Sequence, residues 1–343
     1  MTDGSQSSGR VLIVDGYGCS LRVHRKHLVI EDGVGPRRRE RRLSRVERGT
    51  QTIVVMARDG YITLDAYRWC SNVGITIVQI DKQDGTVVSV GGAVDQTTYD
   101  ARTRRSQVAA GLNGHNHTAL TIIRMVLSEK IARQAQIVDT VCLDRGSASM
   151  IRGISTRLEK ARTAAECRSI EGSAAAIYWQ SWVGVVCPSW PDGDLLRIPA
   201  HWCMYTQRPA VTHTTNRRAT DPVNACLNYG YKIGEVVCRN ALLEQDLDPS
   251  FGVLHTDKPG RASLALDLLE VVRPDIDATV IDLLGANQRV GNHRCSRKMF
   301  HEQGNSVVRV LAPLTYQLVE SMPVWSEKVQ PYARRMRELF QST

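Results

Sequence analysis

Residues 263–274 read Ser-Leu-Ala-Leu-Asp-Leu-Leu-Glu-Val-Val-Arg-Pro, an apolar helical pattern that carries two carboxylates. Ser263 is a plausible helix N-cap, and Pro274 is expected to limit the helix. Asp267 and Glu270 are three residues apart, so a helix projects both side chains from one face. Acidic groups flanked by leucine and valine need partners, and a divalent cation would supply one. This stretch therefore predicts a helical domain with an acidic site.

Long helical patterns dominate the chain on both sides of this stretch. They cover residues 119–138, 156–185, 221–246, 262–285 and 315–341. The segment 188–199, which contains three prolines, is expected to be a loop between helices. We predict that residues 98–343 form a larger all-α catalytic domain.

The first 97 residues have a different pattern, because short runs rich in β-branched residues alternate with Asp-Gly turn signals. The predicted strands are residues 11–14, 21–23, 28–30, 52–55, 61–64, 75–80 and 86–90. Their spacing favours a β-sandwich-like domain over a parallel α/β domain. The predicted fold class is therefore α+β, with an N-terminal β-domain at 1–97 and the helical domain at 98–343.

The composition favours an anionic partner. The 343 residues carry 44 lysines and arginines against 35 acidic residues, a formal net charge of +9. Nucleic acid is the leading candidate partner, and a merely basic enzyme is the alternative. No run approaches the ~20 apolar residues that span a bilayer, and residues 1–10 lack the apolar stretch of a signal peptide. We expect a cytoplasmic protein with no membrane partner, whose nine cysteines are mostly buried and reduced.

Two further stretches add candidates for an acidic site. Glu171 lies among small residues at 170–176, and His255 follows a Pro- and Gly-bracketed turn at 248–252. Each alone has a structural interpretation, as an exposed helical glutamate or a hydrogen-bonded core histidine. Two carboxylates and one imidazole together suit a Mg²⁺ or Mn²⁺ ion with open positions for water and phosphate oxygens. Such an ion can polarise a phosphodiester.

Basic residues gather at several places. The segment 36–48 holds seven arginines and two glutamates. The planar guanidinium suits phosphate contacts, but a solvated loop between strands explains the same pattern. Further DNA-binding candidates, for which ordinary surface charge is the alternative, are Arg217, Arg218, Arg294, Arg297 and Lys298.

Four ordered blocks of the helical half resemble the catalytic integrase of CRISPR adaptation, the CRISPR-associated endonuclease that inserts new spacers into the repeat array. The blocks are residues 170–179, 221–231, 247–255 and 263–274, which together span about 105 residues. No block is specific alone, but four in this order are. The N-terminal half resembles the family only in its strands and turns.

The resemblance implies a set of site residues. It places metal ligands at Glu171, His255 and Glu270 for a Mg²⁺ or Mn²⁺ ion, with Asp267 as a supporting or alternative acid. His255 is either a ligand alone or also the proton donor to the leaving oxygen.

The resemblance also implies partners. They are double-stranded DNA, an intertwined homodimer and a small ferredoxin-like subunit, and we assign dimerisation and DNA contacts to the N-terminal domain. Asn224 and Tyr231 match motif positions near the site, where packing and DNA contact are both open.

The expected reaction is metal-dependent transesterification, in which the 3′-hydroxyl of a DNA fragment attacks a phosphodiester at the repeat boundary. Three alternatives share these residues: a stand-alone metal-dependent nuclease, a transposon-type integrase and a non-catalytic DNA-binding scaffold. The tail after Pro313 is expected to be too short for a helix-turn-helix module, which disfavours the transposon-type integrase.

Overall fold

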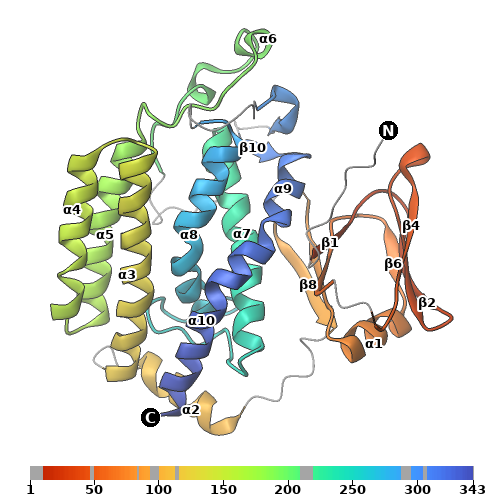
Figure 1. The fold of residues 1–343 in the computed structure, drawn as a ribbon, viewed down its shortest axis with the longest axis horizontal. Helices are drawn as coiled ribbons and strands as arrows, with labels where there is room; N and C mark the ends of the chain where they lie inside the picture. The colour runs from red at the N-terminus through yellow and green to blue at the C-terminus, as the bar shows by residue number, and fades with distance from the viewer. Residues whose placement is uncertain are drawn as a thin grey trace. The chain divides into compact units, whose positions relative to one another are not determined.

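The N-terminal part of the chain forms two four-stranded sheets in the computed structural model (Figure 1). The structure describes residues 11–46, 50–82, 85–92, 100–112, 116–208, 219–286, 295–303 and 307–342. The first sheet has the order β1-β5-β7-β8, formed by Val11–Val14, Thr52–Val55, Thr76–Ile80 and Val87–Gly92. Strands β1, β5 and β7 pair in parallel, and β8 pairs antiparallel to β7.

The second sheet has the order β4-β3-β2-β6, formed by Arg39–Leu43, His27–Asp32, Cys19–His24 and Gly60–Ile62. Strands β2 and β3 form a hairpin whose turn residues, Arg25 and Lys26, have φ of 47° and 67°. Two successive left-handed residues match the right-handed twist of the paired strands. The turn therefore holds the register of this hairpin.

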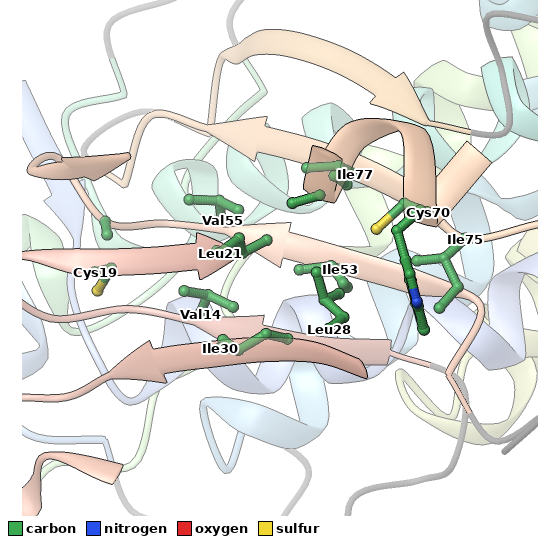
Figure 2. Packing of buried hydrophobic residues seen from close by; sticks show 13 residues of the cluster. Val14, Cys19, Leu21, Leu28, Ile30, Ile53, Val55, Cys70, Ile75 and Ile77 are labelled. Carbon is green, nitrogen blue, oxygen red and sulfur yellow. The ribbon is translucent and has the colours of Figure 1, made fainter. Parts of the chain in front are cut away.

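The two sheets share one apolar core. Val14 and Ile53 of the first sheet belong to the same buried cluster as Leu21 and Ile30 of the second, as Figure 2 shows. Because side chains alternate along a strand, each sheet gives one face to this cluster. The predicted α+β class, an N-terminal β-region followed by a mostly helical region, is confirmed.

Helix α1, Leu64–Val73, was not predicted. Thr63 caps its N-terminus by accepting a hydrogen bond from the backbone N–H of Ala66, and Gly74 ends it with φ of 79°. The helix lies between β6 and β7 in the chain and supplies part of the long connection that parallel pairing of β5 and β7 needs. The spacing of the strands favoured a β-sandwich-like domain over a parallel α/β domain, yet the first sheet has a parallel core with a helix in its connection, and β2 and β6 of the second sheet also pair in parallel.

The helical region is organised around α3, His117–Thr140. It packs against α4 (Arg145–Ser155), α5 (Ala164–Trp182) and α8 (Ser263–Leu283), and α8 packs in turn against α7 (Pro222–Leu243), as Figure 1 shows. Each of the five predicted helical patterns contains a helix. The remaining helices are α2 (Ala101–Leu112), α6 (Asp192–Leu195), α9 (Leu314–Glu320) and α10 (Met322–Gln341).

The ends of α8 differ from the sequence prediction. Ala262 is the N-cap, and Ser263 is the first helical residue, whose hydroxyl donates to the carbonyl oxygen of Thr256. The helix continues through Pro274 to Leu283, although proline removes the N–H that the Glu270 carbonyl would accept. Buried apolar residues on both sides of Pro274 hold the helix together, because tertiary packing outweighs local propensity.

A short antiparallel hairpin, β9 Phe300–Gln303 and β10 Val307–Val310, also interrupts the region predicted to be all-α. The backbone N–H of Val308 donates to the carbonyl of Ala219, and β10 packs near α7. β-Branched valines suit this hairpin better than a helix.

The chain divides into two compact units. The first comprises Met1–Thr98 and Thr315–Pro323, and the second comprises Tyr99–Leu314 and Val324–Thr343. The boundary predicted between residues 97 and 98 falls in 93–99, outside the described residues, and stays a prediction. None of the described helices has the length and apolar character needed to cross a membrane.

Candidate active site

Asp267 of α8 organises the loop that precedes this helix. Its Oδ2 atom accepts hydrogen bonds from the backbone N–H groups of Val253 at 2.6 Å and Leu254 at 3.0 Å. Its Oδ1 atom accepts one from the backbone N–H of His255 at 2.9 Å and lies 2.7 Å from the Nδ1 atom of the same residue. A carboxylate offers about four lone-pair positions, and all are occupied here. The buried Asp267 therefore fixes both the loop and the imidazole.

Other helices hold the same loop. Arg168 of α5 donates to the carbonyl oxygen of Leu254 at 2.9 Å. Gln107 of α2 exchanges two hydrogen bonds with the backbone of Asp248, at 3.0 and 3.1 Å. Because three separate helices contact this segment, the position of His255 is determined by the packing of the helical unit.

The contact with Asp267 also determines which ring nitrogen of His255 faces the site. An ionised carboxylate only accepts hydrogen bonds, so Nδ1 carries the proton and the Nε2 atom of the neutral ring presents a lone pair. Nε2 lies 3.9 Å from Oε1 of Glu270, and the imidazole is 30% exposed. This nitrogen is thus available to a cation or to a proton.

Glu171 of α5 and Glu270 of α8 meet at the amine of Lys130, which belongs to α3. The Lys130 Nζ atom lies 2.5 Å from Oε1 of Glu171 and 2.6 Å from Oε2 of Glu270. Lys130 is buried, with 7% of its side chain exposed, and Glu270 is 4% exposed. Oε2 of Glu270 accepts no aligned hydrogen bond, so its contact with Lys130 is an ion pair.

Positive charges around Glu270 keep it ionised. Burial on its own would raise the pKa of Glu270, but the charges of Arg273 and Lys130 outweigh burial and lower the pKa to about 2. Arg273 lies one helical turn along α8, with Nε 3.4 Å from Oε1 of Glu270. Burial would likewise lower the pKa of Lys130, but Glu270 and Glu171 raise it. Carboxylates and basic side chains in the site therefore keep one another charged despite their burial.

A second buried acid, Asp277, lies on α8 one helical turn beyond Arg273 and two turns beyond Glu270. Its Oδ1 and Oδ2 atoms accept hydrogen bonds from the hydroxyls of Tyr231 at 2.5 Å and Tyr178 at 2.9 Å. Burial raises the pKa of Asp277 to about 6, and the two tyrosine hydrogen bonds limit the rise. Arg273 lies over the Tyr231 ring, 5.0 Å from its centroid. Tyr231 therefore helps to form one wall of the site and holds Asp277.

Arg208 forms another part of the wall. Its Nη1 and Nη2 atoms donate to the side-chain oxygens of Asn224 at 2.7 Å and Asn228 at 2.8 Å, one turn apart on α7. Its guanidinium lies 5.8 Å from the Trp179 ring centroid and 5.3 Å from that of Tyr231. Asn224 also donates to the carbonyl of Gln207 and to Asp221, the N-cap of α7. Asn224 thus positions the arginine.

One cavity of about 400 Å³ unites these groups. The residues that line it include all three predicted ligands, Glu171, His255 and Glu270, together with Asn224 and Tyr231. Lys130, Arg208 and Arg273 also line the cavity, and Asp267 lies behind His255. Residues separated widely in the sequence therefore share one site.

Two of the predicted DNA-binding residues, Arg297 and Lys298, are not among the residues that line this cavity. Arg297 and Lys298 are exposed in the short turn before β9, where the backbone N–H of Arg297 donates to Asp194. Arg217, Arg218 and Arg294 lie outside the described residues. Contacts of these five residues with DNA stay a prediction.

The described part of the arginine-rich segment, residues 36–46, forms many bonds within the N-terminal unit. Arg39 and Arg41 both pair with the buried Asp32, and Arg42 pairs with Glu40. Arg38 donates to the carbonyl oxygens of residues 17 and 18. These arginines stabilise the second sheet, so the segment is more than a solvated loop.

Sequence reasoning did not find Lys130, Arg208 or Asp277. A signal for Lys130 existed, because it follows Ile123 and Leu127 at helical spacing and therefore lies on the apolar face of α3. A charged residue on such a face needs a buried partner. Arg208 lies outside any periodic segment, and its contacts depend on the path of the chain before α7.

The donor set of this site fits a divalent cation, with two carboxylates and one imidazole nitrogen as ligands. Oε2 of Glu270 lies 2.6 Å from the Lys130 Nζ atom, so a positive group already occupies the position beside this oxygen. With Lys130 in contact with both glutamates, no three acidic, histidine or cysteine side chains of the described residues are grouped closely enough to hold a metal as they stand.

A basic α+β chain whose carboxylates, imidazole and guanidinium groups line one cavity has the chemistry of an enzyme that acts on phosphodiesters. Residues 12–308 match the family described as "CRISPR associated protein Cas1". The chain therefore belongs to the Cas1 family, the CRISPR-associated endonucleases and integrases of the adaptation module, and is an enzyme.

Curated relatives agree with this assignment. The chain is 29% identical over 287 residues to "CRISPR-associated endonuclease Cas1 2" of Rhodospirillum rubrum, which covers 79% of this chain and 74% of the relative. It is 28% identical over 276 residues to the protein of the same description in Pyrobaculum aerophilum, covering 79% of this chain and 82% of the relative.

Solved structures share the fold. A casposase bound to integration product superimposes with a TM-score of 0.74 at 21% identity, covering 97% of this chain and 91% of that one. A Cas1 protein from Thermotoga maritima gives 0.68 at 16% identity, covering 95% and 96%. A chain of a Cas6-RT-Cas1–Cas2 complex gives 0.65 at 16% identity, covering 100% of this chain and 36% of that one.

Proposed function

We propose that this chain joins the 3′-hydroxyl end of a DNA fragment to a CRISPR repeat by metal-dependent transesterification. The new bond forms between the attacking 3′-oxygen and the target phosphorus, and the bond from that phosphorus to the leaving oxygen breaks. The observation that carries the proposal is the convergence of Glu171, His255 and Glu270 on one cavity. These residues would hold a Mg²⁺ or Mn²⁺ ion, which polarises the phosphodiester when bound.

The residues of the chain have distinct roles in this proposal. Asp267 orients His255 through Nδ1, which leaves Nε2 either to bind the cation or to accept a proton and pass it to the leaving oxygen. Arg273 and Arg208 place positive charge on the cavity wall, where a DNA phosphate would approach. Tyr231 and Asn224 position these two guanidinium groups.

The partners are part of the same proposal. They are double-stranded DNA, a second copy of this chain and a small ferredoxin-like subunit. The Cas1–Cas2 complex and the DNA-bound casposase among the structural neighbours support such partners. All nine cysteines are unpaired, and six are buried, which suits a reducing cytoplasm.

A strand-joining assay tests this proposal. Labelled 3′-hydroxyl fragments are incubated with a supercoiled plasmid that carries a repeat, with Mg²⁺ or Mn²⁺. Glu171→Ala is expected to abolish joining and to leave DNA binding nearly unchanged. Cleavage without joined product would identify a nuclease instead, and joining without preference for the repeat would favour a transposon-type integrase. Wild-type joining by Glu171→Ala would refute the assignment of this ligand.

A further inference from the structure

Lys130 occupies an unusual position for a lysine, because its buried amine contacts two carboxylates from two other helices. The distances are 2.5 Å to Glu171 and 2.6 Å to Glu270, so a single ammonium group holds the side chains of α5 and α8 together. Its side chain is 7% exposed, which excludes most of the water that would otherwise screen these charges. The ammonium group of Lys130 therefore lies where a metal cation would bind, between two of the proposed ligands.

The two glutamates among these ligands already face two positive groups. Glu171 and Glu270 contribute two negative charges, while Lys130 and Arg273, whose Nε lies 3.4 Å from Glu270, contribute two positive ones. Adding a divalent cation without moving Lys130 would place two further positive charges beside an ammonium and a guanidinium. At separations of a few ångströms in a poorly hydrated site, that repulsion opposes binding strongly.

Lys130 has space into which it can move. It lines the cavity of about 400 Å³ together with Gln134, one turn further along α3. A lysine has a flexible four-carbon stem and a compact charge, so its amine can leave the glutamates while its helix stays in place. In that position the ammonium faces the space that a DNA phosphate would enter.

We propose that Lys130 is a built-in competitor of the divalent cation. Its ammonium joins Glu171 to Glu270 when no metal is bound, and it leaves these carboxylates when the metal binds. This inference rests on the proposed metal site. Lys130 is thus a positioning residue that sets the metal affinity, and cation loading frees one positive charge for the substrate.

Metal binding to the full chain tests the competition directly. Lys130→Met keeps the stem and removes the charge, so Mn²⁺ measured by calorimetry is expected to bind roughly tenfold more tightly or better than to the wild type. The melting temperature of this variant in EDTA is expected to be lower than that of the wild type, because the glutamates lose their shared cation. Saturating Mn²⁺ is expected to raise its melting temperature more than that of the wild type.

Lys328→Met is the matched control. Lys328 of α10 pairs with Glu129, the residue immediately before Lys130 on α3, so the substitution removes an equal charge from a partly buried ion pair between α10 and α3. Its Mn²⁺ affinity is expected to equal that of the wild type. An equal increase in both variants would assign the effect to net charge and would overturn the proposal.

The outcomes separate this inference from the proposed function. A wild-type chain that binds no Mn²⁺ at any concentration would refute the metal site itself. A wild type that binds, with Lys130→Met binding equally or more weakly, would refute the competition alone. If Lys130→Met does not fold, wild-type protein is methylated reductively with and without Mn²⁺ and analysed by mass spectrometry. The expected result is increased labelling of Lys130 but not Lys328 with Mn²⁺, and unchanged labelling of Lys130 would overturn the proposal.

Discussion

Asp267→Asn changes the group that joins His255 to its loop while keeping nearly the same shape. The carboxylate accepts four contacts, from three backbone N–H groups and the imidazole Nδ1. The asparagine side chain has only one oxygen. Its NH₂ group must therefore face the two donors that hydrogen-bond to either Oδ1 or Oδ2 of Asp267, and these two donors lose their acceptor. Each buried donor left without an acceptor costs about 1–3 kcal/mol, and two cost about 2–6 kcal/mol of unfolding free energy.

The same substitution should reduce catalysis through His255. Loss of a carboxylate that orients an imidazole ligand lowers metal affinity or activity by about 10- to 100-fold. The assays are urea unfolding and the initial rate of strand joining at saturating Mn²⁺. Asp275→Asn, on the same helix α8, removes a partly exposed ion pair with Arg133 and is expected to cost less than about 1 kcal/mol and to keep the joining rate.

A double-mutant cycle decides whether Asp267 acts through His255. In a His255→Ala background, Asp267→Asn should reduce joining little further, because the group that it orients is already absent. Independent, multiplicative losses would show that Asp267 acts directly, as the alternative ligand. An Asp267→Asn variant with wild-type stability and wild-type joining would refute the hydrogen-bond assignment altogether.

Two further predictions concern the wall of the cavity. Burial raises the pKa of Asp277 to about 6 from its ordinary value of 3.8, so the folded chain binds a proton more tightly than the unfolded chain. Unfolding free energy should therefore fall by up to about 3 kcal/mol as the pH rises from about 4 to 6, and Asp277→Asn should remove this part of the slope in urea unfolding across that range. The Arg208→Lys substitution replaces the forked guanidinium, which bridges Asn224 and Asn228, with a single amine that cannot bridge them in the same way. The rate of strand joining should therefore fall by about tenfold with little change in unfolding free energy. A wild-type joining rate for Arg208→Lys would remove Arg208 from the proposed phosphate contacts.

Local sequence patterns predicted those features that depend on neighbouring residues. The spacing of Asp267 and Glu270 placed both on one helix, and each long apolar pattern contains a helix. Helix α1 was missed because its ten residues include tyrosine, tryptophan, cysteine and valine, which have modest helix propensity. Its signals were the Thr63 cap and the left-handed Gly74, which are easily interpreted as turn residues.

Features that depend on distant contacts could not be predicted in this way. Spacing places Asp267 beside Glu270, but the turn at residues 252–255 directs its carboxylate toward backbone N–H groups. Lys130 reaches Glu171 and Glu270 because α3 packs against both α5 and α8. Pro274 appeared to end a helix, yet packing around it outweighs the missing hydrogen bond. Tertiary packing decided each of these cases.

The distribution of charge explains why the net charge of +9 does not by itself identify a DNA-binding surface. In the N-terminal segment 36–48, Arg39 and Arg41 are engaged by the buried Asp32. Their charge is compensated locally, so they contribute less to attraction of a distant phosphate than their number suggests. Arg208, by contrast, is held by neutral amides and aromatic rings at the cavity wall, and its charge is not neutralised by these partners. The guanidinium of Arg208, which lines the cavity beside the acidic ligands and also lowers the pKa of Asp277, therefore bears more directly on phosphate binding than the longest run of arginines in the chain.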